Sequence, residues 1–96
     1  METTMKKEWS INDARKGDIL SAQIDGHIAI LIFKEFYGFI RYYILWTPSR
    51  TYINNEAIHD CFHPATQEEK DLLLQEMKKE GWEFDFENCK LKYIEE

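Results

Sequence analysis

The pattern of apolar and polar positions predicts short strands in the first half of the chain and one helix in the second. Residues 18–24 and 27–36 are rich in β-forming residues and flank Asp25-Gly26, a dipeptide typical of tight hairpin turns because both central residues need positive φ. Residues 28–33 are all apolar and do not alternate. Such a run is typical of a strand covered on both faces, so we expect residues 27–36 to be central in a sheet.

A third strand is predicted over residues 39–46, after a tight turn at Tyr37-Gly38, and Pro48 ends it. Residues 51–53 predict a short fourth strand before a turn at Asn54-Asn55. In the third strand, strict alternation places Ile40, Tyr42, Ile44 and Trp46 on one face and Phe39, Tyr43 and Leu45, with Arg41, on the other. Both faces are largely apolar, so both need a covering.

The second half carries clear helix signals. Thr66-Gln67-Glu68-Glu69 is a capping box, in which the Thr66 hydroxyl and the Glu69 carboxylate each accept from the other's backbone N–H. The spacing predicts a helix over 66–80 with an apolar stripe of Leu73, Leu74 and Met77, and Gly81 provides a left-handed C-terminal cap. Near the N-terminus, residues 12–17 predict one helical turn capped by Ser10 or Asn12.

These elements describe a single α+β domain over residues 1–96. It comprises a β-meander (17–53), a loop (54–65), the helix (66–80) and a terminal β-hairpin (82–94). Aromatic residues make up 15% of the chain and need to be buried, whereas a flat sheet would leave one of its faces exposed to water. We therefore expect a small, strongly bent antiparallel sheet or an SH3-like barrel, with one C-terminal helix followed by the hairpin.

Charge narrows the classes of function. The formal net charge is −6; residues 1–48 hold six acidic and six basic residues, whereas residues 49–96 hold twelve acidic and six basic ones. A nucleic-acid partner is therefore not expected, because such binding draws its affinity from neutralised phosphates.

The longest apolar run has six residues, whereas a membrane-spanning helix needs about 20. No secretory signal is evident, so we expect a cytoplasmic protein with Cys61 and Cys89 as free thiols.

The segment FHPATQEEKDLL, residues 62–73, continues through Met77-Lys78, GWEFD at 81–85 and Leu91-Lys92. Together these residues resemble a C-terminal module of small proteins of gut Bacteroidales and their phages. Stretches like 14–20 and 32–36 precede that module in the same proteins. The resemblance implies kinship and a phage-related role, and it implies no activity, ligand or catalytic residue.

One alternative is a thiol hydrolase. Lys16 to Leu20, followed by Gly26 to Ile30, resembles the segment of papain-like cell-wall and lipid hydrolases in which a Gly-Asp strand leads to the catalytic histidine. The resemblance implies His27 as the base and Cys61, in a circularly permuted order, as the nucleophile. Cys61 lies five residues before the capping Thr66, and no third polar residue is evident that would orient His27.

Two further alternatives rest on local composition. His59, Cys61 and His63 are zinc-ligand types within five residues, but the chain lacks a paired Cys-x2-Cys. A surface for single-stranded nucleic acid would combine scattered lysine and arginine residues with tyrosines that stack on nucleobases. The residues concerned are Arg15, Lys16, Lys34, Arg41 and Arg50 beside Tyr42, Tyr43 and Tyr52.

The preferred interpretation is a non-catalytic binding module without a cofactor. Aromatic side chains are enriched at interface cores because they bury much area at little entropic cost. We expect some of the aromatic residues of the β-part to be exposed and to form a surface for a protein partner or a second copy of the chain. The predicted binding residues are Tyr37, Phe39, Arg41, Tyr43, Trp46 and Tyr52.

Overall fold

The computed structural model describes residues 9–57 and 61–94, which form an α+β fold. Its elements are η1, a 3₁₀ turn (Ile11–Asp13), β1 (Ile19–Ile24), β2 (His27–Phe36), β3 (Ile40–Trp46), β4 (Thr51–Ala57), β5 (His63–Pro64), α1 (Gln67–Lys79), β6 (Trp82–Asp85) and β7 (Lys90–Tyr93). The predicted class and the single α-helix are confirmed. Both cysteines are free thiols.

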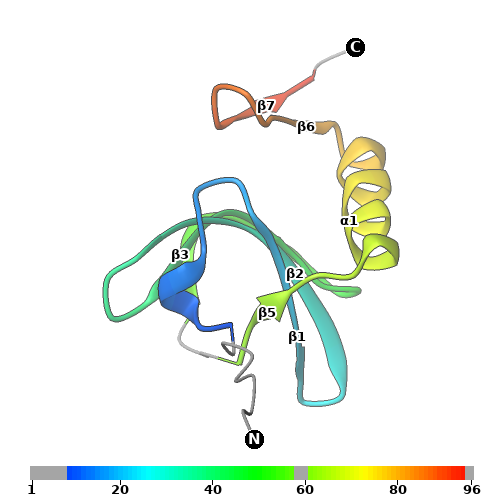
Figure 1. The fold of residues 1–96 in the computed structure, drawn as a ribbon. Helices are drawn as coiled ribbons and strands as arrows, with labels where there is room; N and C mark the ends of the chain where they lie inside the picture. The colour runs from blue at the N-terminus through cyan, green and yellow to red at the C-terminus, as the bar shows by residue number, and fades with distance from the viewer. Residues whose placement is uncertain (1–8, 58–60, 95–96) are drawn as a thin grey trace, which may run out of the picture.

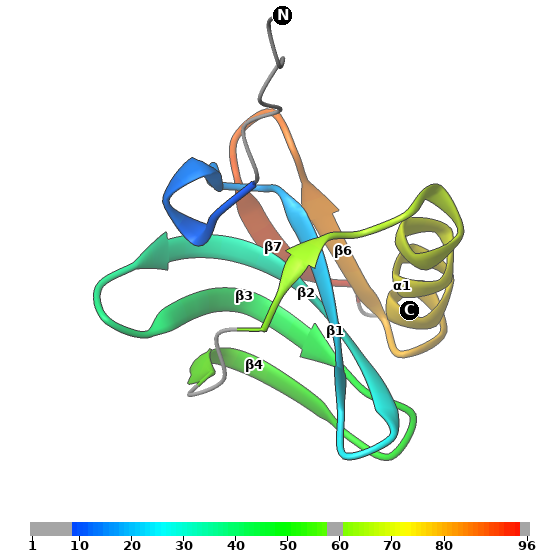
Figure 2. The ribbon, with the colours of Figure 1, turned by 60° about the horizontal axis from the view of Figure 1, so that its bottom comes forward.

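Five strands form one antiparallel sheet in the order β4-β3-β2-β1-β5, with β2 central as its apolar run predicts. Asp25 and Gly26 both adopt positive φ, 51° and 81°, and close the β1–β2 hairpin. The predicted SH3-like barrel is wrong: β4 and β5 are the two edges of the sheet and do not pair with each other (Figure 2). Closure needs paired edges, and β5 contributes just two residues before the chain enters α1.

Parts of the predicted loop over residues 54–65 are strand: β4 continues to Ala57, and His63 and Pro64 form β5. The sequence predicts a turn at Asn54-Asn55, and Asn54 does adopt a left-handed φ of 46°, but the chain continues as β4 and Asn55 pairs with Tyr42. His63 pairs with Ser21 of β1. Asn54 is therefore an irregular residue within an edge strand. Its left-handed conformation costs little free energy there, because no further strand pairs on the outer side of β4.

A pair of bulges between β2 and β3 overturns the predicted alternation of β3. Ile32 pairs with Ile44 and the next β2 residue, Phe33, pairs with Tyr42, so Tyr43 is an extra residue on β3. Lys34 is in turn extra on β2, which restores the register. Tyr43 therefore packs on the same side as its neighbour Ile44, and Tyr42 packs on the opposite side.

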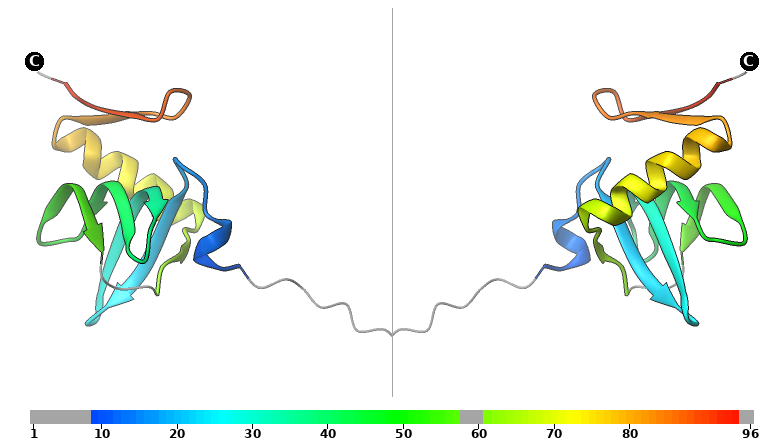
Figure 3. Two further views of the ribbon diagram at one scale, coloured as in Figure 1. Left: turned by 90° about the vertical axis from the view of Figure 1, so that its left-hand side faces the viewer. Right: turned by 90° about the vertical axis from the view of Figure 1, so that its right-hand side faces the viewer.

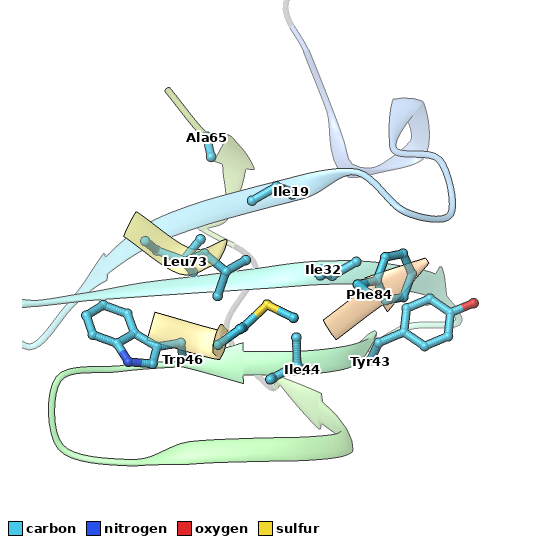
Figure 4. Close-up of a cluster of buried hydrophobic side chains, with 10 residues drawn as sticks. Ile19, Ile32, Tyr43, Ile44, Trp46, Ala65, Leu73 and Phe84 are labelled. Atoms are coloured by element: carbon cyan, nitrogen blue, oxygen red, sulfur yellow. The ribbon is translucent and has the colours of Figure 1, made fainter. Parts of the chain in front are cut away.

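The sheet is covered on both faces, as its sequence requires. Figure 1 shows α1 and the β6–β7 hairpin on one side and η1 on the other. The first core, under α1 and the hairpin (Figure 4), contains Ile19, Ile30, Ile32, Tyr43, Ile44, Trp46, Ala65, Leu73, Met77 and Phe84. The second core, on the η1 side, contains Leu20, Ala22, Ala29, Leu31, Phe33, Ile40, Tyr42, Leu45 and Phe62.

One hydrogen-bond cluster attaches α1 to the sheet. The capping box is formed as predicted: Thr66 Oγ1 accepts from the Glu69 N–H at 3.1 Å, and Glu69 Oε1 accepts from the Thr66 N–H at 2.8 Å. The same Glu69 oxygen accepts from the hydroxyl of Ser21, a fully buried residue of β1, at 2.8 Å. The Thr66 N–H, and next the Ser21 hydroxyl, lower the pKa of Glu69 against the opposing effect of burial.

The terminal hairpin folds back over the sheet from the end of α1 (Figure 3). Gly81 makes this reversal with a φ of 89°, and a Cβ at this position would lie 3.0 Å from the Tyr93 ring. Phe84 then packs on Tyr43 with ring centroids 4.9 Å apart. At the N-terminal end, the helical turn predicted over residues 12–17 is a 3₁₀ turn at Ile11–Asp13, capped by Ser10, one of the two predicted caps. Trp9, Ile11 and Ala14 pack against the second core.

Two adjacent leucines of α1 test this packing. Leu73 is fully buried, whereas Leu74, which we predicted in the same apolar stripe, is 39% exposed. We expect Leu73→Ala to lower the free energy of unfolding by about 2 to 5 kcal/mol, because it leaves a cavity in the first core. Leu74→Ala, the matched control, should cost less than half as much. Urea denaturation measures both, and equal losses would contradict the orientation of α1.

The Glu69 cluster gives a prediction about pH. Because the pKa of Glu69 lies below its ordinary value of 4.5, its carboxylate stabilises the fold above that pH, and this stabilisation is lost as pH falls through the lowered pKa. Glu69→Gln should therefore reduce unfolding free energy at neutral pH, and its deficit against the wild type should shrink below pH 4.5. Glu68→Gln, at the exposed neighbouring position, is the control. A deficit of Glu69→Gln that does not change with pH would refute the role of the charge.

Candidate functional site

The aromatic residues predicted to bind a partner are divided between the core and the surface. Tyr43 and Trp46 are each 8% exposed and belong to the first core, beneath α1 and the hairpin. Tyr37 and Phe39, around the β2–β3 turn, are 75% and 49% exposed, and Tyr52 on β4 is 38% exposed. Tyr43 and Trp46 are thus sealed from any partner, because the covering elements occupy their face.

Arg41, the basic member of that set, is already held by two carboxylates. Its Nε lies 3.0 Å from Glu56 Oε2 and its Nη1 lies 3.3 Å from Glu35 Oε2. All three side chains are exposed, so the pairs add little to stability. They compensate the charge of the guanidinium, which lowers its attraction for an anionic ligand.

The structure does not bring the hydrolase pair together. His27 begins β2 and Cys61 precedes β5, and β1 lies between these two strands in the sheet. The two backbones are therefore two strand spacings, roughly 10 Å, apart. Within the described residues no hydrogen bond joins the two side chains, so the arrangement lacks the contact by which a histidine activates a thiol.

Of the three proposed metal ligands, His59 lies outside the described residues. Cys61 and His63 are both exposed, and His63 Nδ1 lies 3.0 Å from the carbonyl oxygen of Pro64. In residues 9–57 and 61–94 no three side chains of ligand type gather as a metal site would require.

Two of the three tyrosines proposed to stack on nucleobases are not accessible. Tyr42 and Tyr43 are both buried, so neither ring is open to a nucleobase. Two of the basic residues named for this surface lie over tyrosine rings of the same chain. Lys34 Nζ lies 5.5 Å from the centroid of the Tyr43 ring, and the Arg50 guanidinium carbon lies 5.8 Å from the centroid of the Tyr52 ring.

The second core side of the sheet carries an open groove of about 410 Å³, which we call the β4 groove. It extends from the β1–β2 and β3–β4 turns towards the end of β4. Its floor is apolar and its walls carry hydroxyl, amide, imidazole and carboxylate groups. The lining residues are Ile24, Asp25, His27, Ile28, Ala29, Tyr42, Leu45, Thr47, Ser49, Tyr52, Asn55, Glu56, Ala57 and Phe62.

Tyr42 is the distinctive residue of the β4 groove. Its side chain is 3% exposed, yet its hydroxyl makes no hydrogen bond within the described part of the chain. No buried side-chain oxygen or nitrogen of the described residues lacks a hydrogen-bond partner, so the unbonded Tyr42 hydroxyl reaches the open space of the groove, where water or a ligand can bond to it. Burial, and next the nearby Tyr52, raise the pKa of Tyr42, which keeps the phenol neutral and able both to donate and to accept.

Tyr52 and Asn55 supply further polar groups beside Tyr42. Asn55 is directly opposite Tyr42 in the β3–β4 register, and Tyr52 is opposite Leu45. Asn55 Oδ1 accepts from the backbone N–H of Glu56 at 2.8 Å, which leaves the amide NH₂ available. Tyr52 is a binding residue that the sequence predicts. Tyr42 is predicted from sequence solely for stacking on nucleobases, and Asn55 is not predicted at all. Only the β3–β4 register, which pairs Asn55 with Tyr42, brings these two residues together.

A second groove of about 480 Å³ lies between α1 and the terminal hairpin. It is lined mainly by apolar side chains, among them Leu74, Trp82, Phe86 and Ile94. Among these four side chains the indole N–H of Trp82 is the one polar group, so this groove offers mainly apolar area and little that selects a ligand.

We compared the chain with known proteins in three ways. No protein-family model, no curated protein and no solved structure matches it. Among the described residues, no helix has the length and apolar character needed to cross a bilayer. The chemistry of the site therefore has to be argued from its own geometry.

Proposed function

We propose that this protein is a non-catalytic binding module and that the β4 groove is its binding site. The observation that carries the proposal is Tyr42, a tyrosine that is almost wholly buried and whose hydroxyl makes no hydrogen bond within the described residues. Because no buried side-chain oxygen of the described residues lacks a partner, this hydroxyl opens on the groove, where a ligand can bond to it in place of water. The groove is the place from which such a ligand approaches.

The shape and lining of the groove support the same proposal. At about 410 Å³ it falls within the range of roughly 300 to 1,000 Å³ typical of small-molecule sites. The floor of Ala29, Leu45 and Phe62 provides apolar area, and a few polar groups above it fix orientation. His27, Thr47 and Ser49 line the groove, but within the described residues no hydrogen bond joins His27 to either hydroxyl, which favours binding over catalysis.

The exposed aromatic residues around the β2–β3 turn favour a second, separate contact. Tyr37 and Phe39 project from the end of the sheet and do not line the β4 groove. Exposed rings at a turn fit a protein partner or a second copy of the chain, as the sequence led us to expect. This contact would leave the groove open.

Substitution of Tyr42 tests the groove. Tyr42→Phe should leave the free energy of unfolding unchanged or slightly higher, because the lost hydroxyl has no partner in the described chain. It should weaken the binding of a fragment seated in the groove by about three- to tenfold, the value of one hydrogen bond. A chemically mixed fragment library, screened by changes in the backbone amide spectrum at residues 42, 52 and 55, supplies the probes.

Tyr43→Phe is the matched control, since it removes the same atom from the neighbouring tyrosine on the opposite face. It should not change fragment affinity. If no fragment perturbs the groove, or if the two variants weaken binding equally, the proposed site is wrong. A loss of more than 1 kcal/mol of stability in Tyr42→Phe would instead show that its hydroxyl has a structural bond.

A further inference from the structure

We propose that two copies of this chain associate about a twofold axis through the second groove, the one between α1 and the terminal hairpin, which we call the α1–hairpin groove. The proposal does not rest on the function of the β4 groove, because the two grooves lie on opposite sides of the five-stranded sheet. Two properties of the α1–hairpin groove lead to a second copy: the apolar side chains that the fold leaves exposed there, and the arrangement of its charges.

Most of the exposed apolar side chains lie at this groove. Seven large apolar side chains of the described residues are exposed, and four of them, Leu74, Phe86, Tyr93 and Ile94, lie on α1 or in the terminal hairpin. All of these except Tyr93 line the groove, and Tyr93 packs on Trp82, which also lines it, with ring centroids 5.1 Å apart. Clustered apolar and aromatic side chains are typical of the core of a protein interface, because covering them removes their area from water.

The hairpin gains stability from such a covering. Strands β6 and β7 form a two-stranded sheet of their own, separate from the five-stranded one (Figure 1). A two-stranded hairpin is marginally stable in water unless one of its faces is packed. Phe84 is packed against Tyr43, whereas Phe86, which contacts Phe84, is 46% exposed. A second copy placed over the groove would bury Phe86 as well.

The two walls of the groove carry opposite charges. Lys78 on α1 and Glu83 on β6 are the two charged residues that line it. Both side chains are exposed, and neither forms an ion pair within the described residues. Lys92 is opposite Glu83 in the hairpin register, but no ion pair joins these two side chains in the described part of the chain. Both charges of the groove are therefore available to a partner.

This arrangement of charges is complementary to itself. A twofold axis across the groove turns the α1 wall of one copy towards the hairpin wall of the other, so that Lys78 of each copy meets the partner's Glu83. Two ion pairs then flank the apolar side chains. A strongly acidic or strongly basic partner would be attracted to one wall and repelled by the other. The charges therefore favour a second copy of this chain as the occupant.

Sedimentation of the whole chain over a range of concentrations tests the association. We expect the mass to rise from that of one chain to that of two, with a dissociation constant in the micromolar range, as for small interfaces. Ile94→Ser should raise this constant by about tenfold, because it removes an apolar residue that lines the groove. Phe39→Ser is the matched control, since Phe39 is 49% exposed and Ile94 is 46% exposed, and it should leave the constant unchanged.

Charge reversal tests the twofold arrangement. Lys78→Glu and Glu83→Lys should each weaken the dimer by about tenfold, because each variant places like charges opposite each other at both pairs. An equimolar mixture of the two variants should associate as tightly as the wild type, because the mixed dimer restores opposite charges at both pairs. Lys16→Glu makes the same change in net charge at an exposed position away from the groove and should have little effect. Circular dichroism checks that each variant is folded.

Three outcomes would overturn the proposal. One is a chain that stays single at every concentration, which includes the case in which a different protein covers the groove. The second is a dimer that Phe39→Ser weakens and Ile94→Ser does not, because the copies then meet at the β2–β3 turn. The third is a mixture of the charge variants that associates no better than either alone. Fragment binding in the β4 groove should be the same in Ile94→Ser as in the wild type, so failure of this proposal and failure of the proposed function are read separately.

Discussion

The structure depends on one constraint: β2 is apolar on both faces and must be covered twice by a chain of 96 residues. Helix α1 and the β6–β7 hairpin together cover the first face and bury Leu73, Met77 and Phe84 against it. On the second face, the covering comes from the short segment around η1 and from Phe62. The β4 groove lies where this smaller covering ends. The candidate site is thus a consequence of how a small domain distributes its limited chain.

The bulge at Tyr43 determines which tyrosine faces which side. Without the extra residue, strict alternation would put Tyr42 and Ile44 on one face and Tyr43 on the other. The observed register places Tyr43 and Ile44 together under the hairpin, where Phe84 contacts the Tyr43 ring, and leaves Tyr42 towards the groove. Bulges redirect side chains in this way at the edges of many functional sites. Here one residue converts two adjacent, chemically identical side chains into a core residue and a groove residue.

The features that the sequence predicts are those with local causes. The Thr66–Glu69 capping box, the Asp25-Gly26 turn and the central apolar strand are each written within a few residues, and all are present. The wrong predictions concern partners distant in sequence. Asn54 looked like a turn because left-handed φ is a local preference, but pairing with β3 kept the chain extended. The β4 groove depends on the β3–β4 register, on Phe62 and on an unclosed sheet edge, and no local pattern encodes these.

Two hydroxyl groups of buried residues on this sheet differ in what they bond to. Ser21 is buried, and its hydroxyl is bonded to Glu69, so the cost of its desolvation is met within the fold. Tyr42 is buried to a similar degree as a residue, but its hydroxyl has no such bond within the described residues and reaches the open space of the groove. For packing alone, phenylalanine would fill nearly the same volume. The hydroxyl of Tyr42 therefore adds no bond to the described fold, and it is available to a group that enters the β4 groove.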